Sequence, residues 1–185
     1  EEMLEKTGLC YRTDEGRLLD RYHARVIFPV QTVSGMTVAF GGRTLSADKK
    51  VAKYVNSPES EIYSKSRELY GLYLAKHAIV KQNRCYLVEG YMDVIAMHQS
   101  GIENVVASSG TSLTEGQIRL IHRFTDNITV LYDGDSAGIH ASLRGIDMLL
   151  AEGLNVKVLL LPDGDDPDSF SRKHSAADFQ NYVET

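Results

Sequence analysis

The hydrophobic pattern changes near residue 84, and beyond it short apolar runs alternate with segments of helical spacing. Four apolar runs have the length of buried strands: RCYLVEG (84–90), NVVASSG (104–110), NITVLY (127–132) and NVKVLLLP (155–162). Val94, Ile95 and Met97 have helical spacing after the first run, and a helix is predicted over 136–152, before Gly153. Strands that alternate with helices predict an α/β fold, with a mostly parallel four-stranded sheet flanked by helices.

One helix start is indicated by a local motif between the second and third apolar runs. Ser112 and Glu115 form an S-x-x-E pattern ahead of GQIRLIHRF (116–124). This pattern is typical of a capping box at a helix N-terminus. We therefore expect Ser112 to cap the helix that follows.

The pattern before residue 84 is different and predicts a small mixed α+β unit. HARVIFPV (23–30) and MTVAFGGRTL (36–45) are β-rich, a polar stretch follows, and RELYGLYLAKHAIV (67–80) has helical spacing. The boundary between the two parts is expected near KQNR (81–84).

Composition restricts the class of protein. With 185 residues, of which 43% are hydrophobic and 24% charged, the chain is expected to fold as a globular protein. It has no apolar stretch of the roughly 20 residues that cross a bilayer, and its acidic start is not a signal peptide, so we expect a cytoplasmic protein without membrane contact. Cys10 and Cys85 are far apart and are expected to be buried free thiols.

Charge is distributed unevenly along the chain. Residues 21–84 carry 11 Lys and Arg against 4 Asp and Glu, whereas residues 85–185 carry 6 against 15. A basic segment beside an acidic one suits a protein that holds phosphate with one part and cations with the other.

Acidic residues follow three of the four predicted strands. Glu89 and Asp93 follow the first strand, and Asp133 and Asp135 follow the third strand. The fourth strand is followed by four aspartates, Asp163, Asp165, Asp166 and Asp168. In open parallel sheets, ligands bind beyond the carboxyl ends of the strands. Clustered carboxylates hold either a proton or a cation, and oxygen ligands without His or Cys favour Mg²⁺ or Mn²⁺. We therefore expect a metal site at this edge of the sheet.

Each carboxylate also has a structural alternative. Asp135 and Asp166 could cap the helices that follow them, and Asp168 could complement a helix dipole. A calcium loop that begins at Asp133 is excluded, because Ala137 and Arg144 stand where ligands are needed. A phosphatase of the haloacid dehalogenase kind stays a minor alternative that leaves Glu89 without a role.

Several motifs together resemble a known family. VEGYMDV (88–94), LYDGDSAG (131–138) and DGDDPDSF (163–170) resemble the Toprim domain of DnaG-type primases and of type IA and type II topoisomerases. RYHARVIFPV (21–30), FGGRTL (40–45), KYVNSPES (53–60) and YSKSRELYGL (63–72) resemble, in the same order, the basic N-terminal subdomain of the bacterial primase RNA polymerase core. No segment resembles the nucleophilic tyrosine domain of a topoisomerase.

The resemblance implies a fold and its boundaries. It implies a basic α+β subdomain over 1–83, a Rossmann-like Toprim domain over 84–171 and the start of a truncated C-terminal helical subdomain over 172–185. A Cys/His zinc module and a helicase-docking region are not visible, so we expect the chain to be part of a longer protein.

The resemblance also implies the site residues. Glu89, Asp133 and Asp135, supported by Asp93, are implied as catalytic, and Glu89, Asp133, Asp135, Asp166 and Asp168 as ligands of Mg²⁺ or Mn²⁺. Nucleotide or nucleic acid is implied to contact Arg21, Arg25, Arg43, Lys53, Tyr54, Asn56, Lys65 and Arg67. The chain departs from the family at His23, where a further basic residue is common, and at Ser66, where Gly is common.

The implied activity is that of a DNA primase, a DNA-directed RNA polymerase that uses divalent metal to join ribonucleoside triphosphates into an RNA primer. Its expected partners are a single-stranded DNA template and, through a region absent from this sequence, the replicative helicase, in the bacterial cytoplasm. Whether Glu89 acts as general base or as ligand stays open. The alternative is a metal- and nucleotide-binding fragment without activity of its own.

Overall fold

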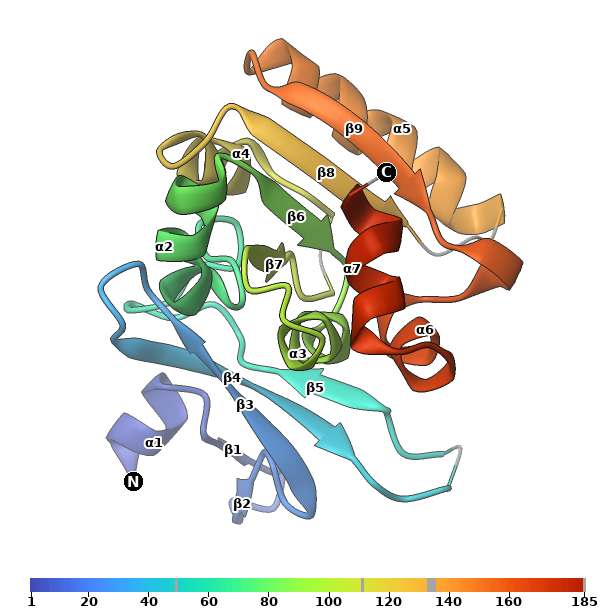
Figure 1. The fold of residues 1–185 in the computed structure, drawn as a ribbon. Coiled ribbons are helices and arrows are strands. Elements are labelled where there is room, and N and C mark those ends of the chain that lie inside the picture. The colour runs from blue at the N-terminus through green and yellow to red at the C-terminus, as the bar shows by residue number, and fades with distance from the viewer. Residues whose placement is uncertain (49, 111, 133–135, 185) are drawn as a thin grey trace. The chain divides into compact units, whose positions relative to one another are not determined.

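The chain folds into two compact units, Glu1–Lys65 (unit 1) and Ser66–Thr185 (unit 2) (Figure 1). The computed structural model describes residues 1–48, 50–110, 112–132 and 136–184, with side chains other than those of residues 132–143 and 163. None of the helices in these ranges is long and apolar enough to cross a membrane.

Unit 1 is built from antiparallel strands and one short helix. After α1 (Glu2–Lys6), β1 (Cys10–Arg12) pairs with β2 (Leu18–Asp20). The strands β3 (Arg25–Gln31), β4 (Thr37–Thr44) and β5 (Tyr54–Asn56) form a second sheet with β4 in the centre. Phe28, Val30 and Ala39 are buried, and the pairing of Val30 with Ala39 places all three on the same face of this sheet.

Unit 2 contains a four-stranded parallel sheet, as the sequence predicts. Its strands β6 (Cys85–Val88), β7 (Val105–Ala107), β8 (Asn127–Tyr132) and β9 (Asn155–Leu160) lie in the order β7-β6-β8-β9. All four side chains of β6 are buried, which explains why its sequence is continuously apolar instead of alternating.

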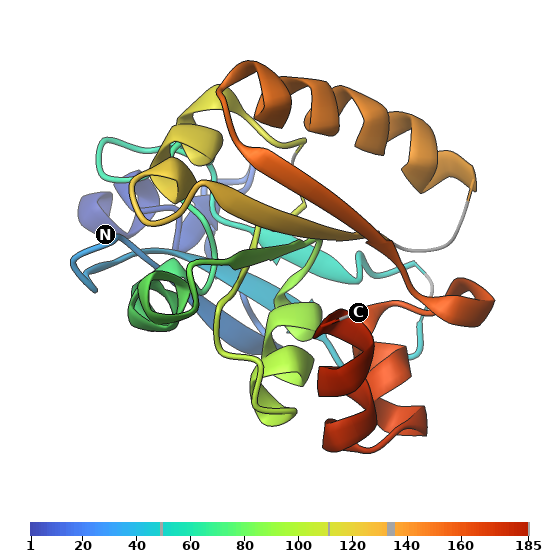
Figure 2. The same cartoon turned by 45° about the horizontal axis from the view of Figure 1, so that its top comes forward.

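Helices flank both faces of the parallel sheet. α4 (Glu115–His122) and α5 (Ser136–Ala151) lie on one face, and α3 (Tyr91–Gln99), α6 (Pro167–Lys173) and α7 (Ala176–Glu184) lie on the other (Figure 2). This distribution follows from right-handed crossovers, because the chain moves from β6 to β7 in one direction and from β7 through β8 to β9 in the other. Helix α2 (Leu72–Gln82) precedes the sheet, and a short 3-10 turn, η1 (Pro162–Gly164), precedes α6.

An apolar core cluster of unit 2 includes residues of the two C-terminal helices. Phe170 of α6 and Phe179 and Val183 of α7 are buried with Tyr86 and Met97 in one apolar cluster. The C-terminal helices therefore complete the core of the α/β unit in this structure. The predicted domain boundaries at residues 83 and 171 stay predictions.

Two predicted helix starts were wrong, for local reasons. The helix predicted over 67–80 begins only at Leu72, because Gly71 has φ +86° and Tyr70 forms a β-bridge with Ala107. The helix expected after Ser112 is capped by Thr114, whose hydroxyl accepts a hydrogen bond from the amide of Gln117 at 3.3 Å.

The two cysteines differ in environment. Cys85, at the start of β6, is a buried free thiol as predicted, whereas Cys10 is only partly buried. Burial strongly raises the pKa of the Cys85 thiol.

Candidate functional site

The carboxyl ends of the strands in unit 2 form the candidate acidic site. β6 and β8 are the central strands, with Leu87 opposite Val130, and β8 continues beside β9 until Tyr132 lies opposite Leu160. Glu89 follows directly after β6, and the segment with the third group of acidic residues follows β9. Strand order reverses between β6 and β8, and such a switch point is where open parallel sheets bind ligands.

Two of the predicted ligands, Asp133 and Asp135, lie outside the described residues. They follow Tyr132, the last residue of β8, in the sequence. Their role therefore remains a prediction from sequence.

Glu89 stands at the edge where the switch point lies. Its side chain is exposed, and its backbone carbonyl accepts a hydrogen bond from the amide of Ser109, 3.1 Å away. Ser109, just beyond the end of β7, has a positive φ of 59°. The backbone after β6 is thus tied to the backbone after β7, which fixes the position from which the Glu89 side chain extends.

Asp93 has a supporting contact one turn beyond Glu89. Its carboxylate is 8% exposed and accepts a hydrogen bond from the amide of Gly90 at 2.9 Å. The bond caps the start of α3 and holds the peptide that directly follows Glu89. The contact serves the helix, and the role of Asp93 as a residue that assists Glu89 stays a prediction.

In the third acidic segment, Asp165 is paired most tightly. Its side chain is 7% exposed and lies 2.6 Å from the Nζ of Lys173. The hydroxyl of Ser169 donates a second hydrogen bond at 2.7 Å. The bond from Lys173, followed by the bond from Ser169, lowers the pKa of Asp165, so this carboxyl is held in its charged form. The sequence alone did not indicate this pair.

Asp166 and Asp168 also have structural contacts. Asp166 is the N-cap of α6, and its Oδ1 accepts a hydrogen bond from the Ser169 amide at 2.6 Å. Asp168 forms an ion pair with Arg172 at 2.9 Å, one turn along the same helix. The capping alternative for Asp166 is therefore realised. Each carboxylate retains further oxygen lone pairs that a metal ion could use.

The chemistry of the side chains at this edge determines which cation they could hold. Among the residues that the structure describes, no three His, Cys, Asp or Glu side chains are close enough together to hold an ion. The donors placed along this edge are nevertheless all carboxylates, which are the hard ligands that Mg²⁺ and Mn²⁺ prefer. The residues thus fit a hard cation by chemistry, and the part of Asp133 and Asp135 in such a site stays a prediction.

In unit 1, the sheet brings three predicted binding residues to one face. Arg43 in β4 lies opposite Tyr54, and Gly41 lies opposite Asn56. Because side chains alternate along a strand, Arg43, Tyr54 and Asn56 share a face. The buried Nε of Arg43 has no hydrogen-bond partner among the described residues.

Two other predicted binding residues are partly used inside unit 1. The Nε of Arg21 donates to the carbonyl of Gly8 at 2.7 Å, and the Nη1 of Arg25 donates to the carbonyl of Ala52 at 2.8 Å. These bonds hold the strands and the loop before β5 together. A guanidinium has five N–H donors, so a phosphate contact is still compatible with both positions.

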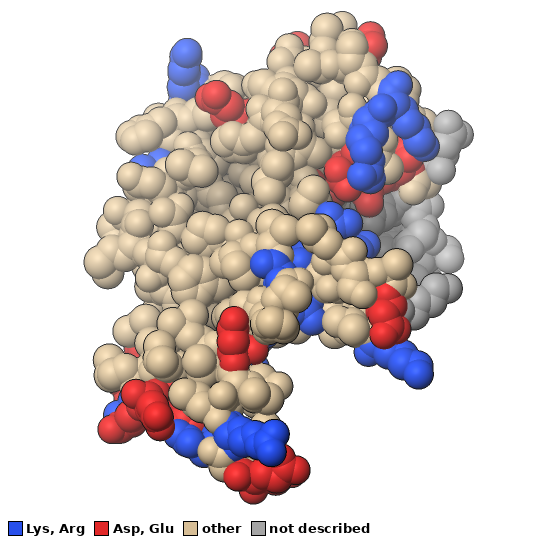
Figure 3. Space-filling view, turned by 90° about the horizontal axis from the view of Figure 1, so that it is seen from below, with Lys and Arg blue, Asp and Glu red and all other residues tan. Residues whose placement is uncertain are grey.

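Lys53, Lys65 and Arg67 complete the predicted basic set. Lys53 is exposed, with its Nζ 5.9 Å from the centre of the Tyr54 ring. The amide of Lys65 donates to the carboxylate of Glu59 at 2.7 Å, and Arg67 is exposed at the start of unit 2. On the face drawn in Figure 3, basic side chains lie beside acidic ones in several places, so phosphate binding there would depend on individual cations.

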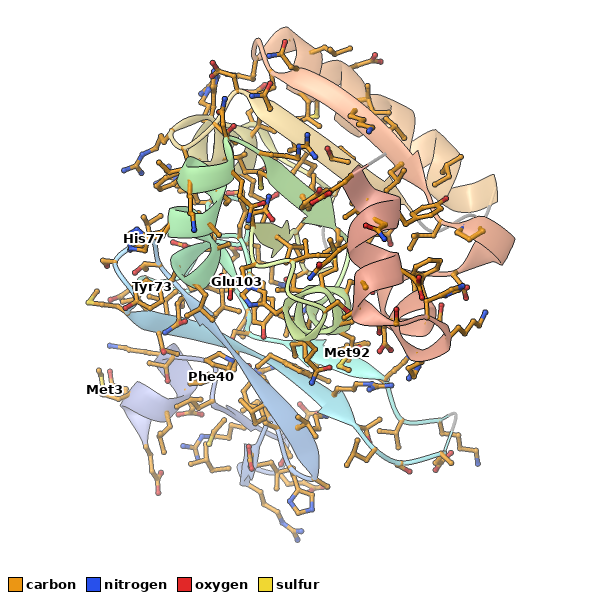
Figure 4. All side chains as sticks on the ribbon, viewed as in Figure 1. Met3, Phe40, Tyr73, His77, Met92 and Glu103 are labelled. Carbon is orange, nitrogen blue, oxygen red and sulfur yellow. The ribbon has the colours of Figure 1, made fainter. Side chains whose placement is uncertain are left out.

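The tyrosines of the helical segment have separate environments. Tyr70 packs edge-on against Tyr91, with ring centres 4.7 Å apart. Tyr73 and His77 extend from neighbouring turns of α2 (Figure 4), and the Nζ of Lys76 lies 4.6 Å from the Tyr73 ring centre. Tyr70 thus belongs to the packing of unit 2, and both Tyr70 and Tyr73 are partly buried.

Family models match both parts of the chain in succession. Residues 1–76 match the family described as the N-terminal domain of the DNA primase catalytic core, and residues 86–171 match the family described as Toprim-like. The parallel sheet with acidic strand ends therefore defines a protein of the Toprim-like class, and the predicted fold is confirmed.

Similar proteins narrow the class to one family. The DNA primase of Halalkalibacterium halodurans is 48% identical over 184 residues, which cover 97% of this chain and 30% of that protein. The structure of the Aquifex aeolicus primase has a TM-score of 0.91 at 37% identity. The match covers 99% of this chain and 45% of the Aquifex aeolicus chain. A structure described as the DnaG primase catalytic domain bound to ssDNA has a TM-score of 0.90 at 42% identity, with 99% of this chain and 59% of that chain covered.

The chain belongs to the DnaG-type DNA primase family and matches part of the catalytic core. It spans about a third of the length of the curated relatives that it matches.

Proposed function

We propose that the chain is part of a DNA-directed RNA polymerase that makes short RNA primers on single-stranded DNA. The observation that carries the proposal is the sheet order of unit 2, which places Glu89 at the switch point beside the strand that leads to Asp133. The matching relatives are named DNA primases, and one similar structure is described as bound to ssDNA.

The chemistry requires a 3'-hydroxyl to attack the α-phosphate of a ribonucleoside triphosphate. The attack forms a phosphodiester bond, breaks the bond between the α-phosphate and the β-phosphate, and releases pyrophosphate. We assign Glu89, Asp133, Asp135, Asp166 and Asp168 to the binding of divalent ions, Mg²⁺ or Mn²⁺, with Asp93 in support. When bound, such ions lower the pKa of the hydroxyl and neutralise charge on phosphoryl oxygens. Glu89, exposed beyond β6, either ligates or accepts the hydroxyl proton.

The basic residues have a separate role in this proposal. Arg43, Tyr54 and Asn56 share one face of the unit 1 sheet and would contact the triphosphate or the template, together with Arg21, Arg25, Lys53, Lys65 and Arg67. Contacts to phosphate give binding that tolerates any base sequence and weakens with salt.

The wider context is also proposed. Primer synthesis belongs to replication, the relatives are bacterial, and the bacterial cytoplasm is the proposed location. Contact with the replicative helicase is assigned to a region outside this chain. The boundaries 1–83, 84–171 and 172–185 are the proposed limits of the basic subdomain, the Toprim domain and the C-terminal helical subdomain.

The test measures incorporation of labelled ribonucleotides on single-stranded DNA with Mg²⁺ or Mn²⁺. Glu89→Gln and Asp133→Asn should each lower the rate about 100-fold or more, as loss of a transition-state-stabilising group does. Glu103→Gln is the matched control, because Glu103 is exposed and precedes β7 at the opposite edge of the sheet (Figure 4).

Full activity of Glu89→Gln would show that the chemistry lies elsewhere. If the parent chain is inactive, Mn²⁺ binding measured by electron paramagnetic resonance separates the alternatives. Binding that both edge substitutions weaken and Glu103→Gln preserves would favour a metal- and nucleotide-binding fragment, and unchanged binding would reject the site.

A further inference from the structure

The first residues of unit 2 are held by the N-terminus of α4. The hydroxyl of Thr114 donates a hydrogen bond to the carbonyl of Ser66 at 2.7 Å. The side-chain amide of Gln117, which is fully buried, donates to the carbonyl of Glu68 at 2.9 Å. These two bonds hold the backbone carbonyls of the residues on both sides of Arg67.

Gly116 provides a third, steric contact to the same segment. A Cβ at this position would lie 2.6 Å from the carbonyl oxygen of Ser66 and 3.7 Å from the Cγ of Arg67. Only a glycine allows the Ser66 carbonyl to approach α4 this closely. The aliphatic part of Arg67 therefore lies over Gly116.

The segment is also anchored on its C-terminal side. Leu69 is 1% exposed, and Tyr70 exchanges backbone hydrogen bonds of 2.9 and 3.0 Å with Ala107. Arg67 itself is exposed, and the described part of the chain forms no ion pair or hydrogen bond with its guanidinium. An exposed cation thus extends from a backbone that is held at Ser66, Glu68 and Tyr70.

We propose that Thr114, Gly116 and Gln117 are positioning residues that hold Arg67 ready to bind a phosphate group of nucleic acid or of a ribonucleoside triphosphate. This inference rests on the proposed function, because it takes phosphate as the ligand of Arg67. An arginine whose backbone is already ordered loses less conformational freedom when it binds, and the phosphate contact is correspondingly stronger. The role of α4 in this proposal is to orient Arg67.

The test is a double-mutant cycle on single-stranded DNA binding. Fluorescence anisotropy with a labelled oligothymidylate gives the dissociation constant and its salt dependence for the parent chain, Arg67→Gln, Gly116→Ala and the double variant. Loss of one phosphate contact to a single strand should lower the salt slope by about 0.7, which corresponds to about fivefold weaker binding at 0.1 M salt. Gly116→Ala should weaken binding about two- to fivefold, because the new methyl group displaces Ser66 and with it Arg67.

The cycle separates positioning from general stability. Alanine has a higher helix propensity than glycine. Helix propensity alone therefore predicts that Gly116→Ala leaves the stability of the fold unchanged or raises it. If Gly116 acts through Arg67, the double variant binds about as tightly as Arg67→Gln alone, because no positioned cation remains to be lost. Additive losses would overturn the inference.

A second variant of the contact to Ser66 and a control variant distinguish positioning of Arg67 from a general effect on the fold. Thr114→Val removes the bond to Ser66 without a change in charge and should also lose its effect in the Arg67→Gln background. Ser112→Ala is the matched control, because Ser112 is exposed and close in sequence. Thermal unfolding of each variant identifies the temperature range in which all are folded, and binding is compared there.

The same cycle with a labelled ribonucleoside triphosphate distinguishes the two phosphate sources. Coupling with the oligothymidylate alone assigns Arg67 to the template, and coupling with the triphosphate alone assigns it to the nucleotide. If Arg67→Gln changes neither affinity while Lys53→Gln weakens binding, the inference is overturned and the proposed function survives. If the parent chain binds neither ligand, both are overturned.

Discussion

At the scale of single residues, the carboxylates of this chain have distinct tasks that depend on their neighbours. Asp93 holds a backbone amide, Asp165 pairs with Lys173, and Asp166 caps a helix. Asp178 belongs to the capping group as well, because it accepts hydrogen bonds from the hydroxyl of Ser175 at 2.7 Å and from its amide at 3.3 Å. An acidic residue can therefore have a structural or a functional role, and its contacts distinguish the two.

Asp178 gives a prediction about pH at this scale. The hydrogen bond from the Ser175 hydroxyl, followed by the bond from its amide, lowers the pKa of Asp178. A carboxyl with a lowered folded-state pKa adds stability that is present above its unfolded pKa of about 3.9 and is lost as pH falls through the folded value.

Ser175→Ala should therefore raise the pKa of Asp178 towards its ordinary value. The stability difference between parent and variant should be largest at neutral pH and should shrink below about pH 4. NMR titration of the Asp178 carboxyl measures the pKa directly, and an unchanged pKa in Ser175→Ala would contradict the assigned contact.

At the scale of elements, the start of α4 links helix capping to the placement of Arg67. The hydroxyl of Thr114 accepts a hydrogen bond from the amide of Gln117 and donates one to the carbonyl of Ser66. The side-chain oxygen of Gln117 accepts a hydrogen bond from the amide of Thr114 at 3.2 Å, and its side-chain amide donates to the carbonyl of Glu68. A helix cap and a segment far away in sequence thus share the same two side chains. Substitutions there should affect both the helix and the segment.

The cap predicts different outcomes for two neighbouring hydroxyl residues. Thr114→Ala should lower the free energy of unfolding by about 1 kcal/mol, which is typical for loss of an N-cap. Ser112→Ala should change it by less than about 0.5 kcal/mol, as surface substitutions do. Urea denaturation of both variants checks this, and equal losses would restore Ser112 as a cap residue.

The C-terminal helix α7 predicts a larger effect. Phe179 has no exposed surface and packs against Phe170, with ring centres 5.0 Å apart. Phe179→Ala should cost about 3–5 kcal/mol, because it leaves a cavity in the core of unit 2. Gln180→Ala, in the same helix but outside the core cluster, is a suitable comparison in the same denaturation experiment. A loss under about 1 kcal/mol for Phe179→Ala would mean that α7 does not belong to the core.

At the scale of the whole molecule, the chain separates two kinds of chemistry between two units. The antiparallel sheet of unit 1 carries Arg43, Tyr54 and Asn56 on one face, and the parallel sheet of unit 2 carries its carboxylates at one edge. The uneven charge along the sequence does not coincide with this division, because unit 1 carries 10 Lys and Arg against 9 Asp and Glu, and unit 2 carries 10 against 16. The carboxylate edge lies at the end of the central strands, whose stability sets the geometry of the site.

Cys85 reports on that stability. Its thiol is fully buried, and burial strongly raises its pKa, so the reactive thiolate is suppressed in the folded state. An alkylating reagent should therefore label Cys85 only through opening of the sheet, at a rate that tracks the stability of unit 2. Mass spectrometry after native labelling measures this in a Cys10→Ser background. Rapid labelling of Cys85 in the folded chain would contradict its burial.

The sequence by itself determined the class of fold and the family. Apolar runs and helical periods are local properties, so the four strands and their parallel arrangement could be predicted, and α5 begins at Ser136 as expected. The motifs around Glu89 and Arg43 are local too, which is why they indicated the family before any contact was known. The end of the helix before Gly153 was also correct to within one residue.

Only the tertiary structure decided how individual side chains are used. The cap at Thr114, the break at Gly71 and the ion pair of Asp165 depend on partners that a local pattern does not specify. The same holds for the internal bonds of Arg21 and Arg25, because their acceptors are backbone carbonyls distant in sequence. A hydrogen bond requires two atoms within about 3 Å, and folding alone brings such atoms together.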